Sequence, residues 1–132
     1  MWSNPLLTIL LGLTLAGLSV PRALQAQKPT PQLSADSATV TDEVTAQGRK
    51  IFHGKGTCYA CHGQHLQGGP VAPHLLGPKW RNGDGSFDMI LHVVRGGVPG
   101  TMMVSHPGGI SDAEAIIVAN YVYAVSHKLT KP

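Results

Sequence analysis

The stretch "GTCYACHGQ", from Gly56 to Gln64, contains both cysteines of this 132-residue chain. Cys58 and Cys61 are separated by two residues, and His62 follows the second cysteine directly. On a helical turn these three positions are i, i+3 and i+4, so their side chains project to the same side. The motif therefore predicts two thiols and one imidazole that face a common partner.

C-x-x-C-H is the signature of covalent haem attachment, and the geometry gives the reason. The thiols of Cys58 and Cys61 can each add to a vinyl group of one porphyrin. The imidazole of His62 can then reach the iron from the same face. One haem c, held by Cys58, Cys61 and His62, is therefore the cofactor that the motif predicts.

Three other interpretations of the motif are open. A disulfide between Cys58 and Cys61 closes a very small loop, contributes little global stability and leaves His62 unexplained. A structural zinc site has four ligands, usually with a second Cys or His pair, and no such pair shows the required spacing here. A thioredoxin-like dithiol is typical of a strand–helix–strand context, which this region does not offer.

The N-terminal region predicts export. Residues 5–20, "PLLTILLGLTLAGLSV", carry no charge, and Ala26 is a small residue suited to the position before a cleavage site. We interpret residues 1–26 as a signal peptide, with an uncleaved membrane anchor as the alternative, because no Lys or Arg precedes the apolar run. Either outcome places the domain in an exported compartment such as the bacterial periplasm. Membrane contact is expected only if this segment is retained.

The remaining chain divides into a linker and one small domain. Residues 27–40, "QKPTPQLSADSATV", are polar with two prolines and predict a flexible linker. Residues 41–132 are the predicted domain, which is small enough to need a stabilising cross-link or cofactor. Without residues 1–26 the chain has nine basic and seven acidic residues and no basic block. This balance argues against a nucleic-acid partner.

Three helices are predicted, each from a capping signal. The first starts after Thr41 and stops at Gly54, the second starts after Ser86 and stops at Gly96, and the third starts at the Ser111–Glu114 capping box and ends near His127. The expected buried stripes are Phe87, Ile90, Leu91 and Val94 on the second helix and Ile117, Tyr121, Ala124 and Val125 on the third. Residues 68–86 are rich in Gly and Pro and predict an ordered loop. No β-sheet is evident, so the fold class is all-α.

From Gly48 to His127 the chain resembles a class I c-type cytochrome. The resemblance lies in "GRKIFHGKGTCYACHGQHLQGGPVAPHLLG", "VRGGVPGTMM" and "ISDAEAIIVANYVYAVSH". It implies the cytochrome c fold, with three main helices and loops wrapped around one covalently bound haem, and with the first and last helices crossing at right angles. Gly48 and Phe52 match the small residue and the aromatic residue of that crossing. Residues 119–121 are their expected counterpart on the last helix.

The resemblance also implies a second axial ligand, commonly a methionine sulfur. Met102 and Met103 lie in the loop where the family has this ligand, about eight residues before the last helix. Met103 fits that count better, and Met102 is the alternative, since Val104 follows where the family usually has proline. His106 or an open sixth position completes the possibilities.

Further site residues follow from the resemblance. Pro73 matches a proline whose carbonyl accepts the N–H of the iron-binding histidine, and Leu75 matches an apolar residue on the haem. Trp80 and Arg81 are candidates for hydrogen bonds to the haem carboxylates, with loop packing and a solvated charge as the alternatives. Met89 is expected to pack on its helix. The other histidines are expected at the surface, namely His53, His65, His74, His92, His106 and His127.

The function expected first is electron transfer by a monohaem cytochrome that cycles between Fe(II) and Fe(III), with His62 and Met103 as axial ligands. Such a protein is a carrier and not an enzyme by itself. Its expected partners are redox proteins, with a dehydrogenase as donor and an oxidase or another cytochrome as acceptor. The alternatives are a haem subunit of an exported dehydrogenase or terminal oxidase complex, and a haem peroxidase or sensor with an open sixth site.

Overall fold

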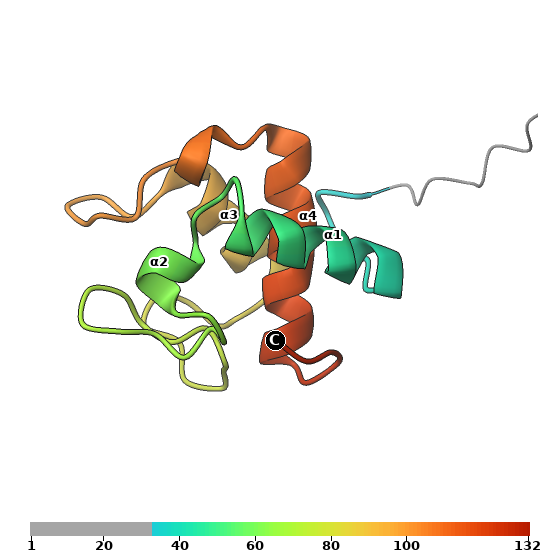
Figure 1. Cartoon of the computed structure of the whole chain (residues 1–132), viewed down its shortest axis with the longest axis horizontal. Coiled ribbons are helices and arrows are strands. Elements are labelled where there is room, and N and C mark those ends of the chain that lie inside the picture. Colours follow the sequence, from blue (N-terminus) through green and yellow to red (C-terminus); the bar gives the residue numbers. More distant parts are fainter. Residues whose placement is uncertain (1–32) are drawn as a thin grey trace, which may run out of the picture. The chain divides into compact units, whose positions relative to one another are not determined.

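The computed structural model describes residues 33–132 (Figure 1). Its elements are α1 (Asp42–His53), α2 (Tyr59–His62), α3 (Phe87–Gly96), the 3₁₀ turn η1 (Pro107–Gly109) and α4 (Asp112–Ser126). No β-strand occurs within these residues, so the predicted all-α fold class is confirmed. The predicted signal peptide, residues 1–26, and residues 27–32 of the predicted linker lie outside the described residues.

The three longer helices begin at the predicted capping residues. Thr41 Oγ1 accepts a hydrogen bond from the Val44 backbone N–H at 3.2 Å. Ser86 Oγ accepts one from a backbone N–H in the first turn of α3, also at 3.2 Å. At α4 the Ser111 hydroxyl accepts from the Glu114 N–H, and the Glu114 carboxylate accepts from the Ser111 N–H at 2.7 Å. These side chains satisfy N–H groups that the first helical turn leaves without partners.

Helix α1 runs across α4, and this contact uses the residues expected for it (Figure 1). Gly48 is buried at the crossing, where a Cβ atom would collide with Cβ of Tyr121 and lie 2.7 Å from the Ile117 carbonyl oxygen. The Phe52 and Tyr121 rings pack edge to face with centroids 5.7 Å apart. The absence of a side chain at Gly48 therefore allows the two backbones to approach closely.

Most of the predicted core residues are buried. Phe87, Ile90 and Leu91 of α3 join the α4 residues in one core, while Val94 is partly buried. On α4 the residues with little exposure are Ala115, Val118, Ala119, Asn120, Tyr121, Val122, Ala124 and Val125. Ile117 is only partly buried, so its place in the predicted buried stripe is a correction.

Asn120 of α4 is fully buried and hydrogen-bonds to the segment that precedes α1. Its side-chain oxygen accepts a hydrogen bond from the Thr39 backbone N–H at 2.5 Å, and its NH₂ group donates to the Ile116 carbonyl at 2.9 Å. Ala35 and Ala38 pack against the core beside this bond. Residues 33–40, expected to form part of a flexible linker, therefore contact the folded domain.

Within residues 33–132, none of the helices has the length and apolar character required to cross a bilayer.

We predict that Gly48→Ala destabilises the domain. Overpacking at the crossing costs about 1–3 kcal/mol, whereas alanine gains only about 1 kcal/mol of helix propensity. Chemical denaturation followed by far-UV circular dichroism measures the difference. Gln47→Ala, at the exposed neighbouring position, is the control and stays within about 0.5 kcal/mol of the parent protein. A Gly48→Ala variant as stable as the parent would contradict the close crossing.

Candidate functional site

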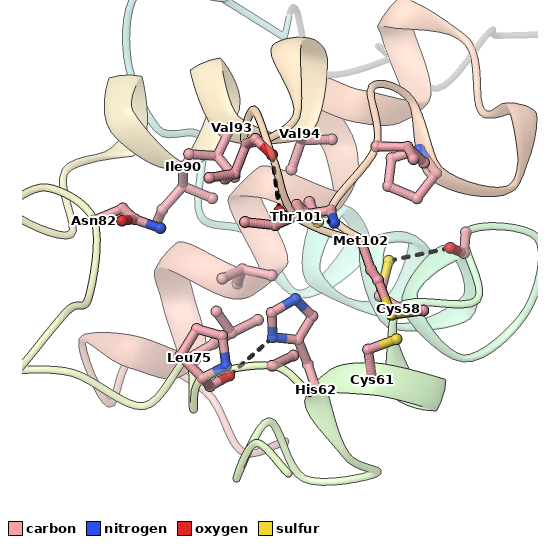
Figure 2. A pocket seen from close by; sticks show the side chains of 18 of the residues that line it. Cys58, Cys61, His62, Leu75, Asn82, Ile90, Val93, Val94, Thr101 and Met102 are labelled. Carbon is pink, nitrogen blue, oxygen red and sulfur yellow. Dashed lines mark hydrogen bonds between the residues drawn. The ribbon is translucent and has the colours of Figure 1, made fainter. Parts of the chain in front are cut away.

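A largely apolar cavity of about 280 Å³ lies beside α2 (Figure 2). Its walls come from Phe52 of α1, residues 56–57, α3, α4 and the segments 71–82 and 98–108. Among the described residues that line it, Arg81 is the one with a permanent charge. Such a lining favours an apolar occupant over a hydrated ion.

Cys58, Cys61 and His62 enter the cavity from one helical turn. Cys58 is the N-cap of α2 and already has helical dihedral angles, φ −60° and ψ −36°. The His62 backbone N–H donates to the Cys58 carbonyl at 2.9 Å, which closes the turn. All three side chains line the cavity, as Figure 2 shows. The structure thus brings together the three residues that the spacing singled out.

The two thiols are separate and partly buried. Burial raises the pKa of Cys58 to about 11, and the nearby Gly56 carbonyl accepts from its Sγ at 3.5 Å. Cys58 is therefore a neutral thiol near pH 7. Within residues 33–132 no group of three or more His, Cys, Asp or Glu side chains is placed to hold a metal ion, so the four ligands of a structural zinc site are not assembled there.

A hydrogen bond to the Pro73 carbonyl fixes the orientation of His62, as the resemblance to c-type cytochromes implied. Its Nδ1 lies 2.9 Å from the Pro73 carbonyl oxygen, and because a carbonyl can only accept, Nδ1 carries the proton. Burial lowers the pKa of His62, which favours the neutral imidazole. The other ring nitrogen, Nε2, then has a free lone pair and points into the cavity (Figure 2). A neutral imidazole oriented by such a hydrogen bond is what an iron ligand requires.

The loop after His62 folds back to bring Pro73 into place. The Gly68 N–H donates to the His62 carbonyl at 2.7 Å, and the Leu75 N–H donates to the Leu66 carbonyl at 2.7 Å. Gly68 has φ +79°, and a Cβ atom there would lie 2.7 Å from the Pro73 carbonyl carbon. Close packing against Gly68 therefore fixes the carbonyl that holds His62.

Met102 and Met103 both line the cavity but differ in exposure. Met102 is 73% exposed, whereas Met103 is partly buried. The Met103 backbone is held on both sides, since its carbonyl accepts from the Val98 N–H at 2.8 Å and its N–H donates to Thr101 Oγ1 at 3.1 Å. Figure 2 places Thr101 and Met102 on the side of the cavity that His62 faces.

The other residues named from the sequence also gather here. Leu75, Trp80 and Arg81 line the cavity, as does Met89, which packs against the core as well. Sequence reasoning missed Asn82 and an apolar wall of Ile90, Val93, Val94, Val98, Val118 and Val122. The helical periodicity of α3 and α4 could have indicated that wall, although it does not tell which stripe faces a cofactor.

None of the six histidines expected at the surface lines the cavity. The exposed members are His65, His74, His92 and His127. His53 and His106 are partly exposed and hydrogen-bonded. The ring nitrogens of His53 lie 2.9 Å from two backbone carbonyl oxygens, and Nδ1 of His106 lies 2.9 Å from Ser105 Oγ.

A haem suits this set of residues. Two thiols and a neutral imidazole leave the same turn, the imidazole presents Nε2, and the opposite walls are apolar. Cys58 and Cys61 would hold the porphyrin through thioether bonds, and His62 would hold the iron.

A family comparison agrees with this chemistry. The sequence model of a family described as "Cytochrome C oxidase, cbb3-type, subunit III" matches residues 43–122, which is more than half of the chain. The chain belongs to this cytochrome family. The cytochrome is a class I monohaem c-type protein, so the resemblance found in the sequence and the expected haem c cofactor are both confirmed.

Solved structures share the fold of this cytochrome. Cytochrome cL from the marine methylotrophic bacterium Methylophaga aminisulfidivorans is 22% identical, with a TM-score of 0.58 over 66% of this chain and 58% of that one. A chain of the reducing HAO-like protein complex of Kuenenia stuttgartiensis is 24% identical, with a TM-score of 0.56 over 78% of this chain and 53% of that one. The cytochrome thus spans little more than half the length of either.

A third structure, the c-type cytochrome NirC, is 25% identical, with a TM-score of 0.49 over 70% of this chain and the whole of that one. No curated protein matched the chain. Family membership supports a haem-based role in electron transfer for the matched domain, residues 43–122.

We predict that Gly68→Ala raises the reduction potential of the haem. The added Cβ displaces the Pro73–His74 backbone and weakens the bond from His62 Nδ1. A weaker bond makes the imidazole less basic, and a less basic ligand stabilises Fe(III) less. Redox titration of the haem protein measures the shift. Gly69→Ala is the control, because a Cβ there meets its nearest atom at an ordinary 3.5 Å. Equal potentials in both variants would show that Gly68 does not set the His62 orientation.

Proposed function

We propose that this cytochrome is a monohaem electron carrier in which His62 and Met103 are the axial ligands of the iron. The observation that carries the proposal is a cavity with a preset imidazole on one side and a methionine-bearing loop on the other. Haem supplies the iron that alternates between Fe(II) and Fe(III). The protein's contribution is to fix both ligands and to exclude water from them.

Two features of the site favour a high potential for such a carrier. The apolar walls disfavour the extra positive charge of Fe(III) because burial of charge is costly. A methionine thioether is a neutral ligand that raises the potential further. The hydrogen bond from His62 to the Pro73 carbonyl makes the imidazole more basic and therefore lowers the reduction potential.

Met103 is a better candidate for the sixth ligand than Met102. Its side chain is partly buried and its backbone is hydrogen-bonded to Val98 and Thr101, whereas Met102 is largely in solvent. A preset backbone lowers the entropy cost of holding a sulfur in place. A thioether at the sixth position also leaves no iron site for a substrate, which favours a carrier over a peroxidase or sensor.

Partner docking is proposed at the mouth of the cavity. Val71, Met102 and Val104 line the cavity and are 61%, 73% and 59% exposed. An exposed apolar rim beside a redox centre suits a small, transient interface. The partners we expect there are redox proteins, with a dehydrogenase as electron donor and an oxidase or another cytochrome as acceptor. We place this exchange in the periplasm or another exported compartment.

A second candidate function is a haem subunit within an exported dehydrogenase or terminal oxidase complex. Two observations support it. The matching family is described as an oxidase subunit, and a chain of an HAO-like protein complex has a similar fold. Affinity purification of the full chain from its own cells distinguishes the two. A stoichiometric enzyme partner that survives purification favours the subunit, and an isolated haem protein favours the carrier.

Separate substitution of the two methionines tests the ligand assignment. We predict that Met103→Ala abolishes the weak near-infrared band of an iron–methionine bond and lowers the reduction potential by roughly 0.1–0.3 V, within the ~0.8 V range that axial ligands span. Met102→Ala is the matched control and keeps the band. Loss of the band in Met102→Ala alone would transfer the role to Met102. A high-spin ferric spectrum in the unmodified protein would support the open-site alternative.

A further inference from the structure

The segment that carries both methionines leaves α3 and returns to it. At its start the Gly97 N–H donates to the Val93 carbonyl at 2.8 Å. At its end the His106 N–H donates to the Val94 carbonyl at 2.9 Å. Residues 97–106 therefore form a loop whose two ends are hydrogen-bonded to the last turn of one helix.

Ser105 and Gly97 tighten this loop. Ser105 Oγ donates to the Arg95 carbonyl at 2.5 Å, which adds a third bond between the loop and the end of α3. Gly97 has φ +71°, and a Cβ atom there would lie 2.6 Å from the Met103 carbonyl oxygen. The Met103 backbone is thus held directly against the end of α3.

Arg95 also ties this end of α3 to the start of α4. Its Nε and Nη2 donate to the two carboxylate oxygens of Asp112 at 2.6 and 2.7 Å, a two-pronged contact of fixed geometry. Hydrogen bonding from Arg95 lowers the pKa of Asp112, so the pair stays charged near neutral pH. His106 Nε2 lies 3.8 Å from the same carboxylate. Arg95 therefore contacts the loop through its carbonyl and α4 through its side chain.

We propose that Ser105, Arg95 and Asp112 form a latch that keeps the loop 97–106 closed and so controls how readily Met103 leaves the iron. This inference rests on the proposed ligation by Met103. An outward movement of the loop at Ser105 breaks the Ser105–Arg95 bond, and the Arg95 side chain is itself held by Asp112. Covalent attachment at Cys58 and Cys61 keeps the cofactor in place during such an opening, so the latch controls access by external ligands without unfolding the domain.

Imidazole binding to the ferric full-length haem protein tests the latch, because imidazole occupies the sixth position only when the methionine has left. We expect Ser105→Ala to raise the apparent imidazole affinity about fivefold, the loss of one hydrogen bond. Arg95→Met should raise it about threefold, as for a largely solvated ion pair. Ser105→Thr keeps the hydroxyl and should restore an affinity near that of the parent.

Lys55→Met is the matched control. Lys55 Nζ pairs with Glu114 Oε2 at 2.7 Å, so it also binds a carboxylate in the first turn of α4, but it belongs to the loop before Cys58. Its loss should leave imidazole affinity unchanged. Far-UV circular dichroism of each variant reports global stability, which each latch variant should lower by about the free energy that its change in imidazole affinity implies.

The outcomes separate the latch from the function on which it rests. Parent-like imidazole affinity in Ser105→Ala and Arg95→Met, with a large increase in Met103→Ala, overturns the latch and leaves Met103 ligation standing. An equal increase in imidazole affinity in Lys55→Met also overturns the latch. A parent protein that lacks the near-infrared band and binds imidazole as tightly as Met103→Ala overturns both proposals.

Discussion

One helical turn determines the chemistry of this protein. It sends Cys58, Cys61 and His62 into the same apolar cavity, and that cavity lies at the junction of every main element. A folded unit of this size buries limited apolar surface, so a covalently held cofactor that fills the cavity supplies interior contacts that the side chains lack. The haem is then part of the core as well as the redox centre.

The scaffold and the ligand-bearing segments have separate tasks. The α1–α4 crossing at Gly48 is a close contact between the two helices. The loops that follow α2 and α3 carry the groups that define the site, and each is fastened by its own short hydrogen bonds. Pro73 is set by the fold-back at Gly68, and Met103 by the return of its loop to α3. Rigid helices thus position loops whose contacts tune the haem.

Local signals in the sequence were sufficient for much of this arrangement. The caps at Thr41, Ser86 and Ser111 fix helix starts through contacts within four residues, and the cysteine spacing is itself a local geometry. The resemblance to c-type cytochromes added the Pro73 contact. Contacts between residues far apart in the chain could not be predicted from the sequence. Asn120 looks like a polar interruption of an apolar helix until its partner, 81 residues earlier, is known.

The same limit applies to charged residues at the surface. Arg95 and Asp112 lie 17 residues apart, and the sequence alone predicts each of them to be a solvated charge. In the structure they form an ion pair that joins α3 to α4 beside the methionine loop. Leu66 is fully buried with φ +60°, a conformation that sequence pattern does not predict for leucine. Both features follow from the way loops pack on the core, which depends on the assembled fold.

The most direct test of this account is the intact mass of the purified chain together with its visible spectrum and a thiol assay. The account predicts a mass increased by one haem, the spectrum of a low-spin c-type haem, and no reactive thiol at Cys58 or Cys61. A colourless protein with two free thiols, or with a disulfide between them, would contradict it.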